Sequence, residues 1–245
     1  MSALGFSMFL IASSTYAGTV TCTGALAPPT YNINGILSTG PVSDGPVTGS
    51  ISACPALVVT ASGSQGGDGS HGVLASAVYY FAVSGTSGTT VTVLVDGYLA
   101  TAASAANLGF GFQEAQADAT LDVQSRLGHF IATSESVASP GQTKSNSWSG
   151  TLRVPVLVDD INSVTLDASL YLLSVSGGSA YADPHIYIDP ATPNASAFSL
   201  LMSPGVGNAL ASTAAPEPST WSLTLSCVAA GLVAGRRMRR SRASQ

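Results

Sequence analysis

Residues 114–124 read EAQADATLDVQ, an uninterrupted alternation of small or apolar residues with polar ones. A period of two places successive side chains on opposite faces of a β-strand, whereas a helix repeats its apolar face every 3.6 residues. One face of this predicted strand is apolar: Ala115, Ala117, Ala119, Leu121 and Val123. The other face is polar: Glu114, Gln116, Asp118, Thr120, Asp122 and Gln124. The stretch therefore predicts a sheet with one buried face and one solvated face.

The same alternation recurs along the chain, between short segments rich in glycine and serine. Further strands are predicted at residues 73–83, 89–99, 148–158 and 164–175. Ala100 to Leu108 is alanine-rich and is expected to be a short helix or a loop. We therefore predict an all-β fold, an antiparallel β-sandwich or jelly roll. A β-helix is the alternative, although no short regular repeat is visible.

The charge of the chain is divided unevenly. Between Gly18 and Ala215 there are only three basic side chains, Arg126, Lys144 and Arg153, against twelve acidic ones, a formal net charge of −9. Such a domain repels nucleic acid and anionic lipid, so neither is an expected partner of the body.

The cysteines point to an oxidising compartment. Cys22 and Cys54 are predicted to form a disulfide that closes a loop of about 30 residues. Free thiols or mispairing are the alternatives, and two isolated cysteines are not expected to bind a metal.

The last thirty residues have three parts. Pro216-Glu217-Pro218 is followed by an uncharged run of 17 residues, 219–235, that contains Trp221 and is about 25 Å long as a helix. Five arginines end the chain: Arg236, Arg237, Arg239, Arg240 and Arg242. A helix of this length spans a membrane, and the arginines would stay on the cytoplasmic side, which leaves the body outside. A short amphipathic or core helix with a solvated basic end is the alternative.

In its order of parts this ending resembles the PEP-CTERM sorting tail of bacterial exported proteins. The resemblance implies a single-pass protein of the inner membrane that is recognised and processed by an exosortase, and is then released or transferred to the cell surface or exopolysaccharide. Residues 181–190 resemble a stretch that recurs just before the linker in many proteins with this tail, which implies that they form the closing strand of the body. The same tail occurs on unrelated bodies, including some described as ice-binding. It therefore indicates where a body is sent and does not describe its activity.

Residues 1–17 complete this organisation as a predicted signal peptide. An apolar core that includes Phe9 and Leu10 precedes Thr15-Tyr16-Ala17, which has small residues where a signal peptidase cuts. No basic residue precedes that core, so either the true start lies upstream of Met1 or the signal is atypical; a buried N-terminal strand is the alternative. The predicted domains are then a signal peptide at 1–17, a β-sandwich body at 18–190, a linker rich in Ala, Ser and Pro at 191–215, and the sorting signal at 216–242.

The sequence offers little for catalysis. It has no nucleophile elbow, phosphate loop or zinc-protease motif, and its three histidines, His71, His129 and His185, lack a second ligand at metal spacing. The remaining candidates for a catalytic or metal-binding site are acidic side chains: Asp118, Asp122, Asp159, Asp160, Asp183 and Asp189. We expect no cofactor and no metal site, with a calcium site as a minor alternative because oxygen clusters can hold that ion.

These observations favour an exported structural or matrix protein without enzymatic activity. The alternative is a secreted carbohydrate-binding, lectin-like module, in which two or three exposed aromatic rings would stack on sugars. Its candidate aromatic residues are Tyr79, Tyr80, Tyr98, Trp148, Tyr171 and Tyr181. A hydrolase is the third class, and it would need two acids facing each other across a cleft.

Overall fold

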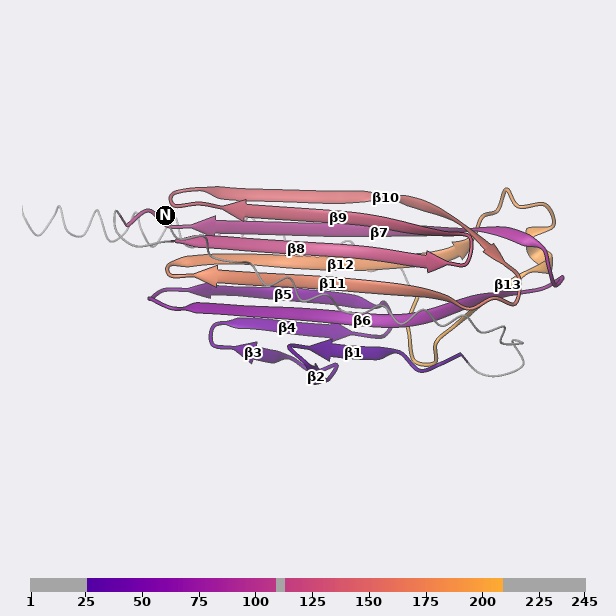
Figure 1. The fold of residues 1–245 in the computed structure, drawn as a ribbon, viewed down its shortest axis with the longest axis horizontal. Coiled ribbons are helices and arrows are strands. Elements are labelled where there is room, and N and C mark those ends of the chain that lie inside the picture. Colours follow the sequence, from indigo (N-terminus) through magenta and orange to yellow (C-terminus); the bar gives the residue numbers. More distant parts are fainter. Residues whose placement is uncertain (1–25, 109–112, 209–245) are drawn as a thin grey trace, which may run out of the picture.

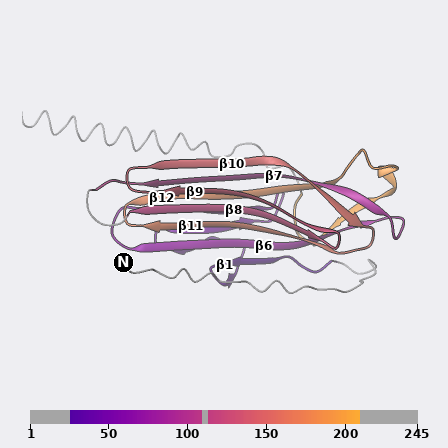
Figure 2. The same ribbon diagram turned by 45° about the horizontal axis from the view of Figure 1, so that its top comes forward.

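The computed structural model describes residues 26–108 and 113–208. These residues form two antiparallel sheets packed face to face, which confirms the predicted all-β sandwich. The long strands lie along the long axis of the molecule (Figure 1; Figure 2). The short strands β1 (Thr30–Ile33), β2 (Ile36–Leu37) and β3 (Val42–Asp44) lie together at one edge (Figure 1). Among the described residues, no helix has the length and hydrophobicity of a membrane span. The predicted signal peptide, membrane helix, sorting motif and terminal arginines lie outside the described residues.

One sheet has seven strands. In spatial order they are β2 (Ile36–Leu37), β1 (Thr30–Ile33), β6 (Ser70–Ser84), β11 (Asn162–Leu173), β8 (Glu114–Ser125) and β9 (Gly128–Ala138), with β13 (Ser199–Met202) paired to the end of β6. The strand that contains the 114–124 alternation lies between two partners. Its five apolar residues are all at most 1% exposed, so the predicted core face is confirmed.

The other sheet has six strands. Their order is β10 (Thr143–Leu157), β7 (Thr90–Ala105), β12 (Ser176–Ile188), β5 (Val58–Gln65), β4 (Val47–Ser52) and β3 (Val42–Asp44). From β5 to β12 every connection crosses from one sheet to the other, except the hairpin between β8 and β9. Strands far apart in the sequence are therefore neighbours, and β7 lies beside β12.

The core between the sheets is lined by alternating residues of both. Val91, Val93 and Val95 of β7 are fully buried, as their alternation predicts. Trp148 is half-buried at the β10 edge, where its ring lies against Gly97. A side chain at position 97 would meet both Trp148 and Leu121, so this glycine makes room for the indole.

The alanine-rich segment was expected to be a helix or a loop, and this prediction was wrong for most of its length. Residues 100–105 continue β7, with Thr101, Ala103 and Ala105 on the buried face. They pair with both β10 and β12, and backbone pairing on two sides overrides the helical propensity of alanine.

The chain after the closing strand also differs from the predicted linker. Residues 191–208 remain on the sandwich: they form the short 3₁₀-helix η1 (Ala195–Ala197), then β13, and end at a bridge between Asn208 and Ala56. Ser203 is buried, donates its hydroxyl to the Ala27 carbonyl at 2.7 Å and accepts from the Tyr80 N–H at 2.9 Å. We call residues 191–208 the C-terminal strap. The ordered body therefore extends beyond the predicted boundary at residue 190.

Cys54 is exposed and lies beside the end of the C-terminal strap, where the Gly207 N–H donates to the carbonyl of Ala53 at 2.6 Å. Its thiol has no disulfide partner among the described residues. Cys22 lies outside those residues, so the Cys22–Cys54 disulfide stays a prediction.

Candidate functional site

Two aromatic rings meet on the outer face of the six-stranded sheet. Tyr98 of β7 and Tyr181 of β12 have ring centroids 5.8 Å apart, with the ring planes inclined by 60°. Alternation along each strand produces this arrangement, because the neighbours Leu99 and Ala182 point inward and are fully buried. Tyr98 is 37% exposed and Tyr181 is half-buried, so the pair forms an angled aromatic surface that solvent reaches.

A carboxylate lies beside these rings. Asp183 is the cross-strand partner of Tyr98, and it accepts a long hydrogen bond of 3.5 Å from the Tyr181 hydroxyl. Burial, and next the charge of Asp183, raise the pKa of Tyr181 to about 12. The phenol is therefore a neutral hydrogen-bond donor at physiological pH.

On both strands, the next residues whose side chains point to the outer face continue the polar surface. His185 of β12 is the cross-strand partner of Asp96 of β7. Asp96 accepts a short hydrogen bond from the Thr151 hydroxyl, and its hydrogen bond with Tyr187 raises the pKa of that phenol. The His185 ring lies 5.3 Å from the Tyr187 ring, and its Nδ1 is buried without a hydrogen-bond partner in the described part of the chain.

An ion pair borders this surface. Arg153 of β10 donates to the carboxylate of Asp189, which is buried at the end of β12 and also accepts from the Ala191 N–H at 2.9 Å. The Arg153 side chain is itself 66% exposed, and one of its nitrogens is engaged by the buried acid. We call the set Asp96, Tyr98, Tyr181, Asp183, His185 and Tyr187 the tyrosine–aspartate face.

The structure brings together only two of the six aromatic residues proposed from the sequence. Tyr79 is 1% exposed and belongs to the core, and Trp148 packs on the inner side of β10. Tyr80 and Tyr171 lie on β6 and β11 of the other sheet, where Tyr171 is 44% exposed. Tyr98 and Tyr181 remain as the candidate pair.

Sequence reasoning did not select Tyr187 and Asp96 for this site. From residues 181–190 it selected Tyr181 as an aromatic candidate and Asp183 and Asp189 as acids, although Tyr181, Asp183, His185 and Tyr187 recur at a spacing of two. That spacing places all four side chains on one face of a strand, so the signal was present. The spacing does not show which strand lies beside these four side chains.

The other predicted acids lie on the opposite sheet or in turns. Asp118 and Asp122 both lie on the outer face of β8, where Ser169 donates to Asp118 at 3.2 Å and His129 contacts Asp122 at 2.6 Å. Asp159 has a positive φ of 71° in the turn after β10, and Asp160 lies 3.8 Å from Arg126. Within residues 26–108 and 113–208, no group of three or more His, Cys, Asp or Glu side chains is placed to hold a metal ion.

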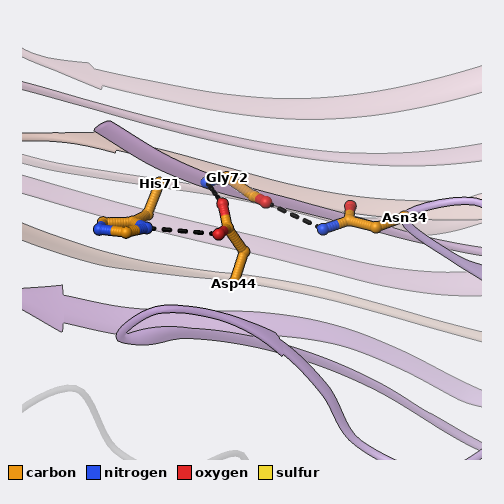
Figure 3. A network of polar contacts seen from close by, with 4 residues as sticks. All are labelled: Asn34, Asp44, His71 and Gly72. Atoms are coloured by element: carbon orange, nitrogen blue, oxygen red, sulfur yellow. Dashed lines mark hydrogen bonds and ion pairs between the residues drawn. The ribbon is translucent and has the colours of Figure 1, made fainter. Parts of the chain in front are cut away.

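A second polar network joins the two sheets near the start of β6 (Figure 3). Asp44 of β3 accepts from the Gly72 N–H at 3.0 Å and lies 3.4 Å from Nδ1 of His71. Asn34 donates to the Gly72 carbonyl at 3.0 Å and accepts from the Leu74 N–H at 2.8 Å. The Gly72 hydrogen bond, and next that of His71, hold the pKa of Asp44 below its usual range. The side chains of Asp44 and Asn34 hydrogen-bond backbone groups of β6, so we interpret the network as structural.

Comparison with protein-family models found no match, and comparison with curated proteins found none either. Among solved structures, TmCBM61 in complex with β-1,4-galactotriose aligns with a TM-score of 0.26 and 9% identity, over 68% of this chain and 92% of that chain. The enzymatically active domain of tailspike protein 4 from bacteriophage CBA120 aligns with a TM-score of 0.24 and 11% identity, over 65% of this chain and 19% of that chain. With TM-scores this low, neither alignment identifies a function.

Proposed function

We propose that the sandwich is a non-enzymatic carbohydrate-binding module, and that it binds sugar on the tyrosine–aspartate face. The observation that carries the proposal is the contact between Tyr98 and Tyr181 on an exposed sheet face, with Asp183 beside both. The crossing connections between β5 and β12 support classing this body as a jelly roll.

The chemistry of the face suits a sugar. An aromatic ring offers an apolar surface for the C–H groups of a pyranose, while polar groups at its rim fix the hydroxyls. Asp183 and Asp96 carry acceptor oxygens, and the Tyr181 phenol oxygen, whose proton is donated to Asp183, is a further acceptor. Because the rings are inclined by 60°, one ring stacks on a given sugar while the other contacts its edge or the next unit.

A glycan array with the full chain in detergent tests this proposal, followed by titration of the best ligand. Tyr181→Ala and Tyr98→Ala are each expected to weaken binding about tenfold or more, the usual cost of removing a central aromatic anchor. Tyr171→Ala is the matched control, because this tyrosine is exposed on the other sheet. Binding that survives loss of both tyrosines, or absence of binding to every glycan, would overturn the proposal. The second outcome would favour a structural or matrix role.

We also propose that this module is displayed outside the cell by its C-terminal tail. Pro216-Glu217-Pro218, the uncharged run and the arginine cluster support recognition by an exosortase in the inner membrane, followed by transfer to the surface, the exopolysaccharide or the medium. The C-terminal strap supports it too, because it anchors the chain to the sandwich as far as Asn208, shortly before the motif.

Fractionation of cells tests the display. Replacing Pro216, Glu217 and Pro218 by alanine is expected to leave an unprocessed form in the inner membrane, with sugar binding unchanged. Recovery of the intact wild-type chain from the cytosol would contradict this part of the proposal while leaving the binding module intact. Hydrolase activity is tested by incubating sugar ligands with the protein. Recovery of the ligands at their original length would support the absence of this activity.

A further inference from the structure

The tyrosine–aspartate face carries negative charge beside its rings. Asp183 lies across from Tyr98, and Asp96 is the next outward residue before Tyr98 on β7. Arg153, on the neighbouring strand, is the nearby base, and it forms an ion pair with the buried Asp189. The other two bases in the described part of the chain lie elsewhere: Arg126 is in the turn between β8 and β9, and Lys144 is at the start of β10. The binding surface is thus acidic as well as aromatic.

We propose that the preferred ligand is a polysaccharide with free amino groups, such as a polymer of non-acetylated amino sugar. This inference rests on the proposed sugar-binding function. A protonated amine gains twice on this face, because carboxylates attract it and the faces of tyrosine rings attract cations. A uronic acid or a sulfated sugar is repelled by the same carboxylates and by the net charge of −9 of the body.

The two carboxylates are already oriented for such a ligand. Asp96 is held by the Thr151 hydroxyl and by Tyr187, and Asp183 by the Tyr181 hydroxyl, so neither has to be reordered on binding. An ionised carboxylate has about four lone-pair sites, so the hydroxyl groups of Thr151 and Tyr187 leave Asp96 with capacity for an ammonium group, while Asp183 adds its charge nearby. A neutral sugar would use the rings but would gain little from the charges.

The test compares three oligomers of equal length on the full chain in detergent: glucosamine, N-acetylglucosamine and a uronic acid. The pH is set between the pKa of a carboxyl group and that of a sugar amine. We expect the glucosamine oligomer to bind at least tenfold more tightly than its acetylated counterpart, and the uronate to bind weakest. Added salt should reduce the affinity for the glucosamine oligomer and leave the affinity for the N-acetylglucosamine oligomer almost unchanged.

Variants separate the charges from the rings. Asp183→Asn and Asp96→Asn keep the shape of the side chain and should lower the affinity for the glucosamine oligomer to that for the acetylated oligomer. Asp118→Asn, on the other sheet, should change neither affinity. Thermal unfolding of each variant checks that it is folded. Equal or tighter binding of the acetylated oligomer by the wild type would overturn this inference and leave the sugar-binding proposal standing. Binding of no oligomer, together with a negative glycan array, would overturn both.

Discussion

The side chain of Asn208 hydrogen-bonds both backbone groups of Ile186: its Oδ1 accepts from the N–H at 2.8 Å and its Nδ2 donates to the carbonyl at 2.6 Å. The paired residues of β5 and β12 end at Ala182, so the amide side chain continues the ladder where β5 has stopped. The C-terminal strap is thus fastened to a central strand by a side chain that imitates a strand partner.

Asn208→Ala is expected to destabilise the fold by about 1–3 kcal/mol, because the buried N–H of Ile186 loses its acceptor. Hydrogen exchange should show faster exchange at Ile186, and the midpoint of thermal unfolding should fall. Ser196→Ala, at an exposed position of the same strap, is the control. An unchanged exchange rate at Ile186 would mean that Asn208 does not fasten the strap.

Gly63 allows two adjacent strands to approach closely. A Cβ placed there would lie 2.5 Å from the carbonyl oxygen of Pro46 and 2.8 Å from Cα of Val47, and both are backbone atoms. Gly63→Ala should therefore destabilise the sandwich by about 1–3 kcal/mol, the usual cost of overpacking. Gly66→Ala is the matched control, because nothing lies within 4 Å of its Cβ position. Chemical unfolding curves measure both changes, and equal midpoints would contradict the close approach.

How far the sequence predicts this molecule depends on the kind of contact. Alternation in residues 114–124 identified which side chains are buried, because burial on one face imposes a period of two. The same period cannot say that Tyr98 lies beside Tyr181, since strand order is decided by how the chain crosses between the sheets. The strap escaped prediction for another reason. Ser203 and Asn208 hold it through hydrogen bonds, and such contacts leave no periodic pattern.

The predicted disulfide would join two segments that both contact the C-terminal strap. Ser203 binds the carbonyl of Ala27, and four residues further along the same strap Gly207 binds Ala53, next to Cys54. Cys22 precedes Ala27 by five residues, which span at most about 18 Å. Mass spectrometry of the exported protein without reduction should find the peptides of Cys22 and Cys54 linked. Cys54→Ser should lower the stability by about 2–4 kcal/mol. Two free thiols in the exported protein would refute the pairing.

Asp167 lies on the outer face of β11, where burial raises its pKa above the usual range and the charge of Asp122 adds to this rise. A carboxyl group whose pKa is higher in the folded protein binds its proton more tightly when folded, so its contribution to stability falls as the pH rises through the window between the unfolded and folded pKa values. Asp167→Asn removes the buried charge and keeps a side-chain oxygen as an acceptor for Ser76, its hydrogen-bond partner. We expect this variant to unfold at a higher temperature than the wild type at neutral pH, and the difference to vanish below the unfolded pKa of aspartate.

The effect is measured as unfolding midpoints of Asp167→Asn and the wild type across this pH range, with Asp68→Asn in the β5–β6 turn as the control. A stability difference between Asp167→Asn and the wild type that stays constant with pH would show that the gain does not come from this ionisation.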